Sequence, residues 1–244
     1  SIIDRCVQAV YRPYIASGYK GNAPTLTDLQ AEIKKQPEPE AQELALAAEL
    51  FISGSLSIFA QKTNVDQNNR LTSYNILDLG EQLLPMGMLV ILESIYNRVI
   101  QNWRSGRRTW VFVDEFSIFF RYPFATNFFL RMWKQVRKRA GYMTGITQNV
   151  GEMLTSKDAC WMLANSEFLI MLSQSASDRA ALAELLNISD TQLSYVENAD
   201  PGCGLMKFGG AFIPFVNSFP EDTELYKLMT TKPADREQVK PNGV

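Results

Sequence analysis

The chain has 244 residues, 46% of them hydrophobic, which is enough to bury a sizeable core. A net charge of −2 gives no global sign of a nucleic-acid or membrane-surface binder. The sequence contains no histidine, which excludes Ser-His triads, histidine general bases and histidine metal ligands. Its three cysteines, Cys6, Cys160 and Cys203, are far apart and form no C-x-x-C motif, so we expect reduced cysteines in a cytoplasmic protein.

The longest apolar passage, LLPMGMLVIL at 83–92, is shorter than a membrane-spanning helix and contains Pro85 and Gly87. We expect no signal peptide at the start of the chain. The sequence therefore predicts a soluble, cytoplasmic protein that contacts a membrane only through its partners.

Helical patterns dominate the first 73 residues, which we assign to a helical subdomain. Helices are predicted at 1–15, 25–36 and 37–54, followed by a polar connection over 55–70. The first helix is expected to stop at Pro13 and Gly18. Thr and Asp near the start of the second helix suit capping, and Gly54 suits the end of the third.

Strand and helix patterns alternate from residue 74 onward. Strands are predicted at 74–79, 109–115, 141–148 and 168–174, helices at 81–103, 126–140, 177–186 and 189–198, and a broken helical stretch before residue 165. A hairpin over 204–216 turns at Gly209-Gly210. This alternation predicts an α/β fold with a mostly parallel sheet over 74–230, followed by a loose tail over 231–244.

The stretch TWVFVDEFSIFF (109–120) ends an apolar strand in two adjacent carboxylates, Asp114 and Glu115. Ligands of parallel α/β sheets bind beyond the carboxyl ends of the strands. In the arrangement called Walker B, the first carboxylate holds hydrated Mg²⁺ and the second accepts a proton from the attacking water. Gln148 ends the next strand, where it could bind a water or a γ-phosphate. For each of these residues taken alone, a polar strand end remains an open alternative.

Positive charge is concentrated around this acidic pair. Between Arg98 and Arg139 there are ten Arg and Lys residues and only two acids, a local charge of +8 that suits an anionic ligand. The helix predicted over 126–140 has one apolar stripe, formed by Phe128, Phe129, Met132, Trp133 and Val136, and we expect Arg131, Lys134 and Lys138 to be solvated. Arg137 and Arg139 lie at the borders of the stripe, where arginine can bind phosphate in its own subunit or across an interface. For Arg137 and for Arg139, the role of an ordinary solvent-exposed arginine is an equally open alternative.

The phosphate-binding half of a nucleotide site is missing from the sequence. No glycine is followed by lysine, so the motif G-x-x-x-x-G-K-[ST] is absent. Gly209-Gly210 is assigned to the hairpin turn and not to a phosphate-binding loop. The chain therefore carries half of a nucleotide site.

Several segments together resemble the C-terminal ATPase domain of conjugative type IV secretion motors, the VirB-four-like (TraC/TraE-type) family, in the version found on conjugative transposons. They are GSLSIFAQKTNV, TWVFVDEFSIFF, LRMWKQVRKRAGYMTGITQNVGEML, MLANSEFLIMLSQSASDRAALAELLNIS and FPEDTELYKLMTTKP, in this order. The resemblance covers most of the chain. It implies a RecA-like P-loop NTPase fold with an all-helical N-terminal subdomain, ATP and Mg²⁺ as ligands, and a hexamer in function.

The resemblance also implies residue roles. Asp114, as the Mg²⁺ ligand through water, and Glu115 correspond to the Walker B pair, and Gln148 to the glutamine of the following motif. Arg137 occupies the place of an arginine finger that acts on a neighbouring subunit's nucleotide. Arg139 and Arg179 are further candidates for nucleotide binding.

In the family, the Walker A strand and loop precede the part that corresponds to Ser1. The chain therefore looks truncated at its start, and we expect it to be inactive alone. Loss of that strand would leave apolar strand edges exposed. We accordingly expect a separate segment or a partner to cover them.

Three functions remain open. The resemblance implies an ATPase that supplies energy to other type IV secretion proteins at the inner face of the membrane. The basic stretch favours a DNA-translocating motor of the HerA/FtsK type, with direct DNA contact. The third possibility is a non-enzymatic scaffold that binds a partner through its helical face.

Overall fold

The structure is a computed structural model that describes residues 1–62, 69–148 and 150–230. Contacts divide the chain into two compact units, Ser1–Leu84 and Pro85–Val244. The sequence-based domain limits after residues 73 and 230 stay predictions. The expected loose tail at 231–244 lies outside the described residues.

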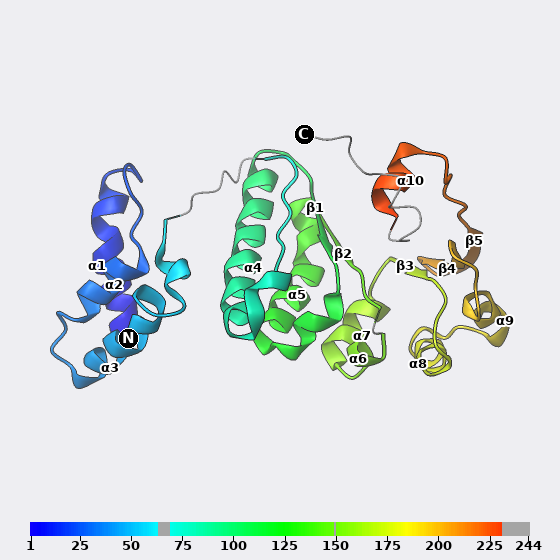
Figure 1. Ribbon diagram of the computed structural model, residues 1–244, viewed down its shortest axis with the longest axis horizontal. Coiled ribbons are helices and arrows are strands. Elements are labelled where there is room, and N and C mark those ends of the chain that lie inside the picture. Colours follow the sequence, from blue (N-terminus) through cyan, green and yellow to red (C-terminus); the bar gives the residue numbers. More distant parts are fainter. Residues whose placement is uncertain (63–68, 149, 231–244) are drawn as a thin grey trace, which may run out of the picture. The chain divides into compact units, whose positions relative to one another are not determined.

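The first unit contains the three expected helices, α1 (Ile2–Ala16), α2 (Leu26–Ile33) and α3 (Pro39–Ile52), and a short 3₁₀ turn, η1 (Ser57–Ala60) (Figure 1). Its core consists of the buried side chains of Cys6, Ile33, Ala41 and Ala45. Helix α1 continues past Pro13, which lies in its last turn, where the missing N–H removes a single hydrogen bond, and ends shortly before Gly18, the other expected stop. The polar connection contains η1, and its residues 63–68 lie outside the described residues.

Two carboxylates in this unit are held by hydrogen bonds. Asp28 Oδ2 accepts from Thr25 N at 2.7 Å and from Thr25 Oγ1 at 2.9 Å, which caps α2. Glu38 Oε1 accepts from Arg5 Nη2 at 2.6 Å. The backbone hydrogen bond from Thr25 lowers the pKa of Asp28, and the hydrogen bond from Arg5 lowers the pKa of Glu38.

Because both carboxyl pKa values are lower in the folded chain, their contribution to stability is present above the ordinary values of 3.8 and 4.5 and is lost as pH falls below them. We expect Asp28→Asn and Glu38→Gln to lower the melting temperature more at pH 6 than at pH 3. Circular dichroism melts of the full chain check this. Glu43→Gln, on the exposed side of α3, is the control and should change neither melt. Equal destabilisation at both pH values would contradict the linkage.

The second unit begins within α4 (Gly80–Arg104), which confirms the helix expected at 81–103. Pro85 and Gly87 do not interrupt it. Among the described residues, α4 is the one helix long and apolar enough to cross a membrane, a test that buried helices of soluble proteins also meet. Met88, Leu92 and Val99 of α4 are buried.

Strands β1 (Thr109–Val113) and β2 (Gly141–Gly145) are parallel and pair in register from Thr109–Gly141 to Val113–Gly145. The connection between them contains η3 (Phe116–Arg121), α5 (Pro123–Gln135) and η4 (Val136–Arg139). The predicted apolar stripe is confirmed, since Phe128, Phe129, Met132 and Val136 are buried and Trp133 is half-buried.

Arg131 and Lys134 of α5 and Lys138 of η4 are exposed, as predicted. The Arg131 guanidinium lies 5.1 Å from the Tyr96 ring centre, and Lys134 Nζ lies 4.7 Å from that of Trp161. Both cations are exposed but rest on aromatic faces.

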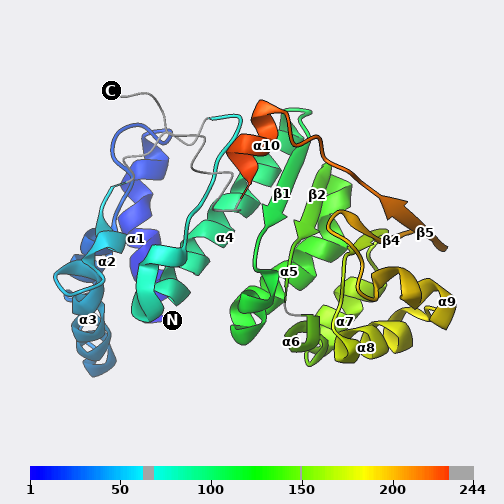
Figure 2. The ribbon, with the colours of Figure 1, turned by 45° about the vertical axis from the view of Figure 1, so that its right-hand side comes forward.

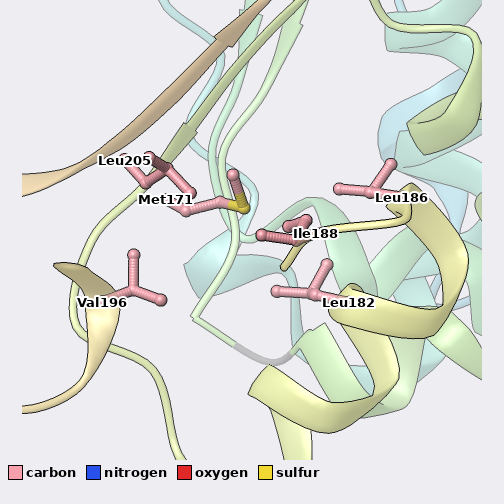
Figure 3. Packing of buried hydrophobic residues seen from close by; sticks show 6 residues of the cluster. All are labelled: Met171, Leu182, Leu186, Ile188, Val196 and Leu205. Carbon is pink, nitrogen blue, oxygen red and sulfur yellow. The ribbon is translucent and has the colours of Figure 1, made fainter. Parts of the chain in front are cut away.

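The remaining elements form a second layer of helices and strands. They are α6 (Val150–Leu154), α7 (Lys157–Ala164), β3 (Phe168–Met171), α8 (Ala176–Leu186), α9 (Asp190–Leu193), η5 (Ser194–Val196), β4 (Cys203–Phe208), β5 (Ala211–Val216) and α10 (Glu224–Met229). Figure 2 shows α6, α7 and α8 as neighbours beside the strands. Figure 3 shows the core of this layer, in which Met171 and Leu205 from the strands meet Leu182 and Leu186 from α8.

Two sequence predictions about the strands are wrong. The sheet is not mostly parallel, because β3, β4 and β5 form a separate antiparallel sheet in which the two-residue turn Gly209-Gly210 reverses the chain. Residues 74–79 form no strand but a loop that leads into the 3₁₀ turn η2 (Leu77–Leu79). Asn75 Nδ2 donates to Asp78 Oδ2 at 3.4 Å, a local contact that favours a turn.

In the part of the chain that the structure describes, one apolar face of each sheet is exposed. Trp110 and Phe112 on β1 are 55% and 67% exposed, and Trp110 stacks on Tyr142 of β2 with ring centres 4.9 Å apart. On the second sheet, Ile170 is 57% exposed. We call the following residues the open apolar faces: Trp110, Phe112 and Tyr142 on the first sheet, and Phe168, Ile170, Phe208 and Ile213 on the second. Among the described residues, β2 and β3 each pair with a strand on one side only.

Candidate functional site

The acidic pair lies where β1 ends. Asp114 follows Val113 directly, and its Oδ1 accepts from Glu115 N at 3.0 Å. Glu115 has φ +47° and ψ +47°, a left-handed conformation that residues with side chains seldom adopt. This conformation turns the chain out of the strand into η3. The Glu115 side chain therefore does not follow the alternation of side chains between the two faces of the strand. Strained backbone of this kind is typical of functional sites.

Gln148 lies against this pair. Its Nε2 donates to Glu115 Oε1 at 2.8 Å. The parallel register brings the two segments together, because Ile146 N donates to Val113 O and Phe116 N donates to Ile146 O, each at 2.8 Å. Asp114, Glu115 and Gln148 therefore lie at the same end of the β1–β2 pair, beyond the carboxyl ends of both strands.

An aromatic residue holds the backbone next to Glu115. The Phe116 ring stacks on Trp133, with ring centres 5.6 Å apart, and meets Phe129 edge-on at 4.9 Å. A Cβ at Gly145 would lie 2.5 Å from Phe116 Cδ1, so this ring requires glycine at the end of β2. Sequence reasoning missed this role of Gly145, although an isolated glycine in a strand signals such close approach.

An ion pair links the segments that follow Glu115 and Gln148. Arg121 Nε in η3 donates to Glu152 Oε1 in α6 at 2.7 Å. This hydrogen bond lowers the pKa of Glu152 and raises the pKa of Arg121. Sequence reasoning did not single out either residue, because only the fold brings together two positions so far apart in the chain.

Arg137 and Arg139 lie away from the acidic pair within one chain. Both belong to η4, which precedes β2, whereas Gln148 follows β2. The strand between them has five residues and is roughly 15 Å long. Arg139 Nη1 donates to Gln135 Oε1 at 3.2 Å, and the guanidinium lies 5.8 Å from the Tyr96 ring centre. Arg137 is exposed.

Arg179 has partners within the second layer. Its Nη2 donates to Glu197 Oε1 at 2.7 Å, and its Nη1 donates to the Gln174 carbonyl oxygen at 3.1 Å. The side chain is 19% exposed. In this arrangement Arg179 ties the start of α8 to the chain that follows η5.

The donor set fits a hydrated magnesium ion. In residues 1–62, 69–148 and 150–230, no three or more Cys, Asp or Glu side chains are grouped to hold a metal. Asp114 offers one exposed carboxylate, and Mg²⁺ commonly binds through one or two carboxylates while keeping waters and taking phosphate oxygens. A hydrated ion shared with a nucleotide therefore suits these residues better than an all-protein metal site.

No family model matches the sequence, and no curated protein is similar to it in sequence. The structure is similar to that of VirB4 of Thermoanaerobacter pseudethanolicus, with a TM-score of 0.72 and 22% sequence identity. The similarity covers 90% of this chain and 64% of that chain, so this chain spans less than two thirds of the VirB4 chain. At this identity the likeness concerns the fold. The resemblance inferred from the sequence is confirmed at that level: the chain has a VirB4-like fold.

Proposed function

We propose that this chain is part of a type IV secretion ATPase whose ATP hydrolysis powers conjugative transfer. The observation that carries the proposal is the 2.8 Å hydrogen bond from Gln148 to Glu115 beyond two parallel strands, in a chain with a VirB4-like fold. In this proposal the fold is RecA-like, and the protein works at the inner face of the membrane through its secretion partners.

Each residue of the cluster receives a distinct role. Asp114 would hold the water shell of Mg²⁺, and the ion would supply charge neutralisation for the phosphates. Glu115 accepts the proton of the attacking water, and Gln148 keeps the Glu115 carboxylate oriented and senses the γ-phosphate. The left-handed backbone at Glu115 supports this role, because it turns the second carboxylate away from the direction of the first.

The arginines are assigned by their distance from this cluster. Arg137 lies at the opposite end of β2, so we assign it to the nucleotide of a neighbouring copy, in a ring such as a hexamer. Arg139 and Arg179 are proposed as secondary phosphate contacts. To reach a nucleotide, Arg139 would exchange its bond to Gln135, and Arg179 its bond to Glu197.

The open apolar faces and the unpaired edges of β2 and β3 favour the presence of a further layer of structure that covers them. Parallel strands are normally covered on both faces. We propose that a further segment covers them and supplies the phosphate-binding loop that the sequence lacks. The chain alone would then be inactive.

A DNA-translocating motor is the second candidate, favoured by the local charge of +8. Both candidates predict Mg²⁺-dependent phosphate release from ATP by the polypeptide in the full length that its gene encodes. The secretion ATPase should respond little to DNA, whereas a DNA motor should be stimulated several-fold, with an activation that declines steeply with salt. Phosphate release with and without single- or double-stranded DNA at 50 and 200 mM salt separates the two. Absence of hydrolysis under all these conditions would leave the non-enzymatic scaffold.

A further inference from the structure

We propose that the Arg121–Glu152 ion pair is a positioning device that keeps Glu115 and Gln148 in contact. The functional significance of this inference rests on the proposed function, whereas the contacts from which it is argued do not depend on it. Arg121 is the last residue of η3, which begins directly after Glu115. Glu152 lies in α6, which begins two residues after Gln148.

Three polar contacts, one after another, join the segment that follows β1 to the segment that follows β2. The first is the backbone hydrogen bond from Phe116 N to Ile146 O at 2.8 Å. The second is the bond from Gln148 to Glu115, and the third is the ion pair between Arg121 and Glu152 at 2.7 Å. The functional contact therefore lies between the other two. Releasing the outer one would loosen α6 against η3 and would weaken the support of Gln148 on that side.

The two sides of this contact are supported unequally. On the Glu115 side, Phe116 is clamped between Trp133, Phe129 and the glycine at 145. On the Gln148 side, α6 is only five residues long, too short to be stable by itself, and packing holds it, with Met153 buried and Val150 against the core around Leu182. The ion pair adds a polar link between α6 and the segment that carries Glu115.

The exposure of the pair argues for a local effect and against a global one. The Arg121 and Glu152 side chains are 62% and 33% exposed, and exposed ion pairs contribute little to overall stability. The same exposure makes the link sensitive to salt. The lowered pKa of Glu152 and the raised pKa of Arg121 keep both groups charged at neutral pH, so the link is present there.

The test follows the Gln148 side-chain amide by ¹⁵N NMR in the full chain, with the resonance assigned from Gln148→Glu. We expect Glu152→Gln and Arg121→Gln each to move this resonance toward that of a free glutamine. The ratio of bonded to free Gln148 should fall by up to about fivefold. The charge-swapped double variant, Arg121→Glu with Glu152→Arg, should restore the wild-type position. In the wild type, 1 M NaCl should reproduce the shift of the single variants.

The matched control is Glu38→Gln, which breaks the 2.6 Å ion pair with Arg5 in the first unit and should leave Gln148 unchanged. A Gln148 resonance that does not move in the single variants, or in high salt, would overturn the proposal. The readout needs no nucleotide. Failure of the full-length polypeptide to hydrolyse ATP would therefore refute the proposed function without touching this result.

Discussion

Replacing Glu115 with glutamine should lower the kcat of ATP hydrolysis by about 10²–10⁴-fold, because under the proposed function the variant loses the group that accepts the proton. Nucleotide binding should change by less than about threefold, since Asp114 and the phosphate contacts remain. The glutamine amide oxygen can still accept a hydrogen bond from Gln148 Nε2, so the local structure is kept. Steady-state phosphate release and the binding of a fluorescent ATP analogue, both with the full-length polypeptide, measure the two effects.

Glu184→Gln is the matched control for this experiment, because Glu184 is exposed on α8 and lies outside the proposed site. It should leave both kcat and the Kd for nucleotide unchanged. Normal turnover by the Glu115→Gln variant would show that Glu115 is not the base, and the assignment of the strand-end carboxylates would have to be abandoned.

The second large effect concerns folding. Phe129 is fully buried and contacts the rings of Phe116, Phe119 and Phe128, with ring centres 4.9, 5.0 and 5.4 Å away. Phe129→Ala should therefore lower the free energy of unfolding by about 3–5 kcal/mol. Urea denaturation of the full chain, followed by tryptophan fluorescence, measures this loss, since all four tryptophans lie in the second unit.

Phe112→Ala makes the same chemical change on the exposed side of β1 and serves as the comparison. Because most of the Phe112 side chain is in water, Phe112→Ala should change the free energy of unfolding by no more than about 0.5 kcal/mol. A loss as large as that of Phe129→Ala would mean that something covers the first open apolar face in solution, for example a second copy of the chain.

The strand-end cluster could be anticipated from sequence because it needs only local information and one general rule. The apolar run before Asp114 identifies a strand, and parallel neighbours end at the same edge of a sheet. The apolar stripe of α5 could be predicted for a similar reason, since it depends on helical periodicity within thirteen residues. Neither inference requires knowledge of how distant segments meet.

The features that escaped prediction depend on contacts between distant segments. The orientation of β3 relative to β4 is set by how α8 and α9 return the chain, and an apolar run has the same appearance in either orientation. The Arg121–Glu152 pair spans 31 positions and involves two residue types that are common on any surface. The error at 74–79 has the opposite cause, because a local bond between Asn75 and Asp78 outweighed a weak strand pattern.

The division of the second unit into two separate sheets has a consequence for cooperativity. Among the described residues, no ladder of hydrogen bonds joins β2 to β3, so the layers built on these strands are connected mainly through α5, α6, α7 and α8. Layers joined in this way are able to open in separate steps. A strand that paired with both edges would merge them into one continuous sheet with one unfolding transition, so that the two layers would become ordered in a single event.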